Sequence, residues 1–234
     1  MKLSIAQNIF EKFPDFIAGV IITRGIDNSG GSDELLQLCR SIEPIVSEQF
    51  AQLENPGRHP LIEPWRRAYR TFGVDPQRYR CSSEALTRQV IKGNDVWGIN
   101  KLVDTYNYVS LKYTLPVGGE DLAKMIGDLE LAFARGDEPF IRLGGTESEP
   151  PQSGEVVYRD NVGVICRMWN WREGDRTKLT EETKSVVIVI DALAPADQTL
   201  VTTAARELVD LVTQFCGGNS TMVLLDRNQT ACML

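Results

Sequence analysis

A chain of 234 residues that is 42% hydrophobic and 24% charged is typical of a globular protein with a core of its own. No apolar run approaches the roughly 20 residues of a membrane-spanning helix, and the charged start of the chain lacks the apolar region of a signal peptide. We therefore expect one domain over residues 1–234, a cytoplasmic location and no membrane partner.

The charge is unevenly spread along the chain. A net charge of −7 opposes tight non-specific binding to nucleic acid, because Lys and Arg supply the affinity for phosphates. Between Arg58 and Lys101, however, nine Lys and Arg stand against four acidic residues, and between Gly119 and Asp160 ten acidic residues stand against four basic ones. This pattern fits a basic face for a nucleic acid, and taken alone it fits two solvated faces better.

Two residue types restrict the possible chemistry. The five cysteines are odd in number and lack a C-x-x-C pair, which disfavours both a disulfide framework and a zinc site. The single histidine, His59, lies in a predicted loop, so the usual histidine-based metal sites and triads are removed. We expect no metal and no cofactor, and any catalysis would use carboxylates, amides, hydroxyls, backbone groups or the substrate.

The first part of the chain predicts one buried strand followed by helices. The strand is the apolar run 16–22. A helix capped by Ser32 follows, and we expect Pro44 to kink or split it. Two short helices come next, one from Pro64 to Gly73 and one from Ser82 or Ser83 to Gly93.

The stretch from Gly98 to Leu122 is the most informative. It begins as a helix in which Asn100, Asp104 and Asn107 share one face. Amides and carboxylates are poor interior helix residues, so this face either ties the helix to the following loop or contacts a ligand. At Pro116 we expect a Gly-Gly turn that carries two carboxylates.

Strands dominate the remainder until a last helix. We expect strands at 129–133, 140–143, 156–159, 162–168, 185–190 and 221–225, a hairpin at Asp160-Asn161, a helix from Asp197 to Gly217 and a loose tail at 226–234. Trp169 and Trp171 alternate with Arg167, Asn170 and Arg172, an arrangement that suits either stacking on a base or a core position. The grouping of helices and strands predicts an α+β fold.

Two motifs in this order resemble the editing domain of the bacterial phenylalanyl-tRNA synthetase β subunit. Residues 99–122 are similar to the family segment P-x-N-x-V-V-D-x-T-N-Y-V and the Pro-Leu-His turn that follows it. The matching positions are Asn100, Val103, Asp104, Asn107, Tyr108, Val109, Pro116, Asp121 and Leu122. Residues 180–183 resemble the family's E-E-T before an apolar strand. The resemblance covers about 97–192, and residues 1–96 are expected to form the helical part of the same domain.

The resemblance implies a freestanding homologue of that editing domain. The implied fold is a layered α+β arrangement with a β-sandwich of unusual topology packed by helices. The implied activity is hydrolysis of the ester that joins a wrong amino acid to the 3′ end of a tRNA. The implied partners are the aminoacylated end of a tRNA or a free amino acid.

Several positions depart from the family pattern. The family's pocket for tyrosine uses a Thr-Asn pair, a His and a Glu. Here Asn107 is retained, whereas Tyr106 stands at the threonine position, Gly118 at the histidine and Val189 at the glutamate. Asp191 lies two residues beyond Val189 and projects from the same strand face, so it is the best substitute carboxylate. We therefore expect a substrate other than tyrosine.

The resemblance also implies roles for particular residues. The expected catalytic groups are Asn107, Glu120 and Asp191. The expected substrate-binding residues are Tyr106, Gly118, Gly119, Arg167, Trp169, Asn170 and Arg172. The tRNA acceptor stem would contact Arg66, Arg67, Arg70, Arg80 and Arg88.

Three functions stay open at this point. The protein can be a deacylase, a binding module that holds a tRNA end or a free amino acid without chemistry, or an interaction protein that kept only the fold. Nothing in the sequence predicts the oligomeric state.

Overall fold

Two β-sheets and six α-helices make up the computed structural model, which describes residues 1–234. The four-stranded sheet has the order β3 (Val117–Asp121), β8 (Ser185–Ala192), β2 (Ile17–Arg24) and β9 (Asn219–Leu225). The six-stranded sheet has the order β10 (Ala231–Met233), β1 (Lys2–Ile5), β4 (Leu129–Phe133), β5 (Val156–Arg159), β6 (Val164–Arg167) and β7 (Arg172–Glu173). All strand pairs are antiparallel except β1 with β4. This is the predicted α+β class.

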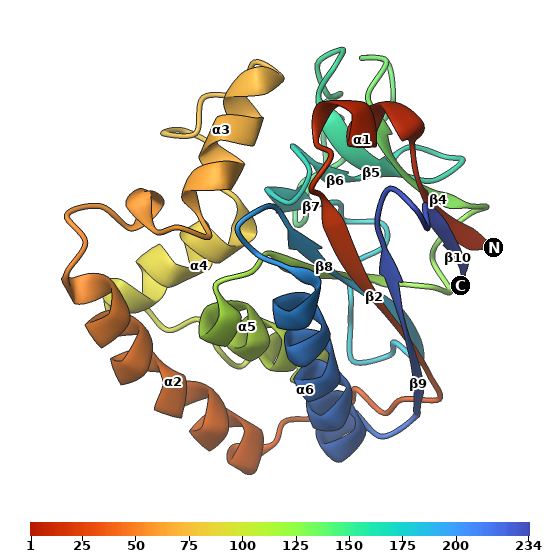
Figure 1. Ribbon diagram of the computed structural model, residues 1–234. Helices are drawn as coiled ribbons and strands as arrows, with labels where there is room; N and C mark the ends of the chain where they lie inside the picture. Colours follow the sequence, from red (N-terminus) through yellow and green to blue (C-terminus); the bar gives the residue numbers. More distant parts are fainter.

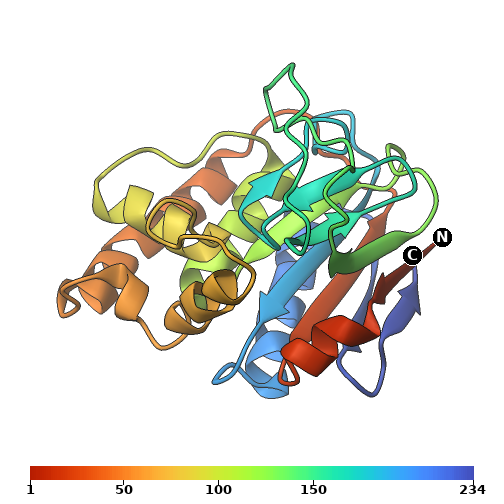
Figure 2. The ribbon, with the colours of Figure 1, turned by 90° about the horizontal axis from the view of Figure 1, so that it is seen from above.

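The helices lie mainly to one side of the sheets (Figures 1 and 2). They are α1 (Gln7–Lys12), α2 (Asp33–Ala51), α3 (Glu63–Thr71), α4 (Ser82–Ile91), α5 (Lys101–Tyr113) and α6 (Gln198–Cys216), with a short 3-10 turn at Pro56–Arg58. No helix is long and apolar enough to cross a membrane. The side chains of Ser32, Asn100 and Asp197 cap α2, α5 and α6 by accepting a backbone N–H.

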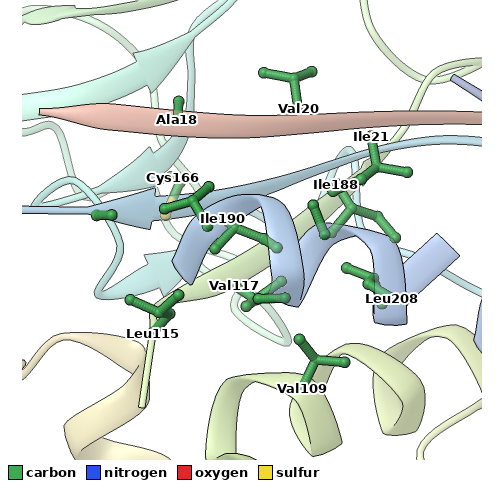
Figure 3. Packing of buried hydrophobic residues seen from close by; sticks show 14 of the residues in the cluster. Ala18, Val20, Ile21, Val109, Leu115, Val117, Cys166, Ile188, Ile190 and Leu208 are labelled. Atoms are coloured by element: carbon green, nitrogen blue, oxygen red, sulfur yellow. The ribbon is translucent and has the colours of Figure 1, made fainter. Parts of the chain in front are cut away.

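Strand β8 lies inside the four-stranded sheet because its side chains are apolar on both faces. On one face Ile188 and Ile190 lie beside Leu208 of α6 and Val109 of α5 (Figure 3). Gly19 of β2 shares this face, and a Cβ atom there would lie 2.8 Å from Val201 of α6, so the close helix contact requires glycine. The opposite face of β8 is turned toward the six-stranded sheet.

Three predicted elements differ from the structure, and one of two alternatives is removed for a fourth. Of the kink or split expected at Pro44, the split does not occur, because α2 continues through Pro44 with its buried stripe packed on the core. Residues 140–143 make only isolated bridges, through Ile141 and Arg142. The C-terminal tail is not loose, since β10 pairs with β1 and brings the two ends of the chain together (Figure 1). The Gly-Gly segment after Pro116 is not a turn but strand β3.

Candidate functional site

A narrow pocket opens between the two sheets, with a cavity volume of about 40 Å³. Its lining residues come from β3, β8, the six-stranded sheet with its turn at Trp169 and Asn170, and Ser82 of α4, and 8 of the 14 are hydrophobic. They are Ser82, Val117, Gly118, Glu120, Leu129, Tyr158, Ile165, Cys166, Trp169, Asn170, Glu173, Val187, Val189 and Asp191.

The two-residue period of β8 puts Asp191 in this pocket. Val187, Val189 and Asp191 share the face of β8 that lines it, as the alternation predicted. On the neighbouring strand β3, Gly118 pairs with Val189 and Glu120 pairs with Val187, so both line the same pocket.

Asp191 is held by a chain of polar contacts. The Tyr158 hydroxyl donates to its Oδ1 at 2.8 Å, and the Asn170 side-chain amide donates to its Oδ2 at 3.1 Å. The Asn170 Oδ1 in turn accepts from the Tyr69 hydroxyl at 2.9 Å. Asp191 is 3% exposed, and this burial raises its pKa to about 7, against the lowering effect of the Asn170 and Tyr158 hydrogen bonds. The result is a fixed carboxyl group that titrates near neutrality.

Glu120 and Glu173 place a pair of carboxyl groups in the same pocket as Asp191. Burial, followed by the neighbouring Glu173 carboxyl, raises the pKa of Glu120 well above its usual range. Burial also raises the pKa of Glu173. The two side chains hydrogen-bond to each other, which requires that the two carboxyl groups share a proton. A ligand cation at this position would replace the shared proton.

Gly118 makes room for this pair. A Cβ atom at this position would lie 2.6 Å from Glu173 Oε1, so the Glu173 carboxylate occupies the space over the glycine. Gly119 faces the other side of β3, where a Cβ would lie 3.2 Å from Leu179 and 3.3 Å from Ile188. Each glycine therefore accommodates a close neighbour, and only Gly118 does so in the pocket.

The polar face of α5 has a structural role at the start of that helix. Asp104 accepts the backbone N–H groups of Gly98 and Ile99, and Asn100 accepts from Asn28 as well as from the helix. These contacts hold the segment before the helix, not the segment after Pro116. Asn107 and Tyr106 do not line the pocket, although the phenol of Tyr106 lies near Glu173 and Glu120, whose charges add to burial in raising its pKa.

Arg167 is not free to bind a phosphate. Its guanidinium makes a bidentate pair with Glu155 at 2.8 and 2.9 Å and also donates to the Glu149 carbonyl. Arg172, by contrast, is exposed and stacks on Trp171. Trp169 is fully buried, lies against Phe13, Phe16 and Trp65, and has an indole N–H without a partner.

The five arginines expected to contact tRNA divide into two groups. Arg66, Arg80 and Arg88 converge on the buried carboxylate of Glu84, with N···O distances of 2.6, 3.7 and 2.9 Å. Arg67 pairs with Glu63 at the surface, and Arg70 is exposed without an ion pair. Part of the excess positive charge of this segment is therefore neutralised inside the protein by Glu84.

Several residues of the site are not predicted from the sequence. Tyr158 lies in a strand that was predicted without a role, and Tyr69 and Ser82 lie in the two short helices, for which only the arginines were given a role. Glu173 lies in the two-residue strand β7, which is too short to show a periodicity. The only available signal was its place just after the Trp-rich segment.

Two sheets that enclose a carboxyl-lined pocket, with helices packed outside, define an α+β domain with a small-ligand site. Residues 64–217 match the family model of the B3/4 domain, and the chain belongs to this family. This confirms the family resemblance seen in the sequence.

Similar proteins include phenylalanine-tRNA ligase beta subunits. The chain is 26% identical over 108 residues to the subunit of Photorhabdus laumondii and 27% identical over 110 residues to that of Fusobacterium nucleatum, covering 46% and 47% of this chain. Each match spans 13% of the length of the relative. An N-terminal fragment of the phenylalanyl-tRNA synthetase beta subunit from Pyrococcus horikoshii aligns with 95% of this chain and 53% of its own, at 14% identity and a TM-score of 0.49.

Proposed function

We propose that this B3/4 domain hydrolyses the ester of a mischarged aminoacyl-tRNA, with Asp191 as the general base. The observation that supports this is the Asp191 carboxyl, fixed by Tyr158 and Asn170 in a pocket, with a pKa of about 7. A base is most effective when its pKa lies near the working pH.

Hydrolysis of an activated ester requires few groups from the protein. Asp191 takes a proton from a water molecule as the water oxygen attacks the ester carbonyl. The bond from that carbonyl carbon to the ribose oxygen then breaks, and Asp191 returns the proton to the ribose oxygen, which leaves as a hydroxyl group. Tyr158 and Asn170 keep the carboxylate in one orientation, and Tyr69 orients Asn170. Asp191 is therefore the catalytic residue of this proposal, and Tyr69 is a positioning residue.

Binding of the tRNA body would use arginines that reach the surface. Arg70 and Arg172 are exposed and have no ion pair. Of the three arginines around the single carboxylate of Glu84, Arg80 and Arg88 are 38% and 26% exposed, whereas Arg66 is 11% exposed. Guanidinium groups at the surface suit contacts with phosphates, which position a nucleic acid without reading its sequence. We propose Arg70, Arg80, Arg88 and Arg172, and not Arg66 or Arg167, for the tRNA contacts.

The test is deacylation of a panel of mischarged tRNAs. The wild-type protein should accelerate the loss of at least one aminoacyl group, and Asp191→Asn should slow that reaction by about 10²- to 10⁴-fold, the usual contribution of a general base. Asp210→Asn, at an exposed carboxyl on α6, is the matched control and should leave the rate unchanged. Acceleration that survives Asp191→Asn would refute the assignment of the base.

A second function is favoured by the lost family groups. Gly118 and Val189 stand where the resemblance expects a His and a Glu, and Asn107 does not line the pocket. These changes suit a module that binds an aminoacyl group or free amino acid without cleaving it. Equilibrium binding of the ligand with an unchanged ester half-life would identify this module.

A further inference from the structure

The pocket carries unpartnered groups of opposite kinds. Glu120 and Glu173 are two carboxyl groups that share a proton and have no ion pair. The fully buried Trp169 lines the same pocket, and its Nε1–H is a donor with no partner. Buried charges need a counter-charge and buried donors need an acceptor, so the pocket suits a ligand with a cationic group, which replaces the shared proton, and a hydrogen-bond acceptor.

The two kinds of group lie at different places along the pocket. Ser82 Oγ, a second unpartnered buried atom, belongs to a residue whose backbone N–H donates to the Asn170 carbonyl, next to Asp191. The Glu173 carboxylate lies over Gly118, which pairs with Val189, two residues before Asp191. Val189 and Asp191 lie roughly 7 Å apart along β8. A ligand that reaches from the carboxyl pair over Gly118 to Asp191 therefore suits the four-carbon stem of a lysyl side chain.

The walls between these points are aliphatic. Val187 and Val189 face this part of the pocket. Such a surface suits methylene groups, because long cationic side chains bury their stems on apolar surface while the charged end meets a polar partner. A neutral side chain would leave the two carboxyl groups without a counter-charge.

We infer that the pocket selects a lysine-like aminoacyl group, whose side-chain ammonium lies between Glu120 and Glu173 and whose carbonyl faces Ser82 and Trp169. This inference rests on the proposed function, since it names the aminoacyl class that the same site accepts. The ester carbonyl then lies beside Asp191, where the proposed base acts. A tyrosyl side chain, which has no cationic group, would not provide the counter-charge for Glu120 and Glu173.

The direct test compares L-lysinamide with L-norleucinamide by isothermal titration calorimetry. The two amides share the backbone, the α-ammonium and the aliphatic stem, and they differ in the terminal ammonium. Lysinamide should bind at least tenfold more tightly, and cadaverine, which lacks the carbonyl group, should bind at least tenfold more weakly than lysinamide. Equal affinity for the two amides would overturn the inference, and equal affinity for cadaverine would assign the pocket to free diamines.

Two variants test the carboxyl pair. Glu120→Gln and Glu173→Gln should each reduce the preference for lysinamide to less than threefold, whereas Glu182→Gln, at an exposed acid, should retain it. Unchanged preference in both pocket variants, with folding verified by circular dichroism, would overturn the role of the pair. Because the amides report binding alone, selective binding without deacylation would refute the proposed hydrolysis and keep this inference, and unselective deacylation would do the reverse.

Discussion

Two centres of buried carboxyl groups differ in their partners. Glu84 on α4 is fully buried and is surrounded by Arg66, Arg80 and Arg88. Glu120, Glu173 and Asp191 line one pocket and have no cationic partner within 4.0 Å. The first centre joins α3, α4 and the loop between them, whereas the second lies between the two sheets.

The presence or absence of arginine partners distinguishes a buried carboxyl group with a structural role from one with a functional role. A buried charge is costly, and three arginines around Oε1 offset that cost at Glu84, although its Oε2 has no hydrogen-bond partner. In the pocket no arginine offsets the cost, so burial favours the protonated form and raises the pKa values of all three groups. Perturbed carboxyl groups in a concave site are typical of catalysis or ligand binding.

Removing the paired carboxylate should have the largest effect on stability. Glu84→Gln leaves three guanidinium groups close together without a counter-charge, and it should lower the free energy of unfolding by about 3 kcal/mol, the low end for a broken buried pair, because the arginines remain partly hydrated. Urea denaturation measures this loss. The control is Glu63→Gln, which breaks only the exposed pair with Arg67 and should change stability by less than about 0.5 kcal/mol. Equal losses would show that Glu84 is no more than a surface partner.

The pocket should instead make stability depend on pH. The pKa of Asp191 is 3.8 as its ordinary value and about 7 in the folded protein, so the folded state holds a proton that the unfolded state loses. Stability is therefore full below about pH 4 and falls as pH rises toward 7. At about 1.4 kcal/mol per pH unit, this group removes roughly 2.5 kcal/mol between pH 5 and pH 8.

Urea denaturation at pH 5 and pH 8 measures this dependence. Glu120 and Glu173 shift in the same direction and add to the fall, and the nearby phenols of Tyr106 and Tyr158 stay neutral because their pKa values are raised. Asp191→Asn should be clearly less sensitive to pH than the wild type. A wild-type protein that gains stability from pH 5 to pH 8 would contradict the protonated pocket.

The sequence predicts the elements that carry a clear local signal, such as a run of apolar residues or a capping residue. Strand β8 is apolar on both faces, and α2 and α6 begin at capping residues, so each was found from local signals. Strand β3 was not found, because Val117–Asp121 contains two glycines and two acids, a composition that disfavours strands. Its pairing with β8 and the close neighbours of its glycines determine its conformation, and neither is visible locally.

The site, too, was predictable only where the position of a residue depends on a local pattern. Alternation along β8 placed Asp191 on the correct face, because a period of two is a local property. Arg167 and Arg66 are not free to bind phosphate because they form ion pairs with Glu155 and Glu84. Pairings between residues that are distant in the chain have no signature in the sequence. A basic residue in a sequence is therefore a candidate phosphate contact only when its tertiary partner is known.

The smallest expected effect on stability belongs to Gly118→Ala, which tests the pocket most sharply. The added methyl group would meet the end of the flexible Glu173 side chain, so the carboxylate moves aside, and the loss of backbone freedom in the unfolded chain offsets part of the cost. The change in the free energy of unfolding should stay within about 1 kcal/mol. Affinity for lysinamide should nevertheless fall at least tenfold, because the methyl group takes the place of the carboxylate.

Gly119→Ala is the matched control for that variant, because its methyl group would meet Leu179 and Ile188 on the other side of β3. It adds the same atom to the same strand but leaves the Glu173 carboxylate in place, so the preference for lysinamide over norleucinamide should persist. If both variants lose that preference together, the loss reflects the pairing of β3 with β8 and not the space over Gly118. If only Gly118→Ala loses it, a carboxylate without a cation is what the pocket offers to its ligand.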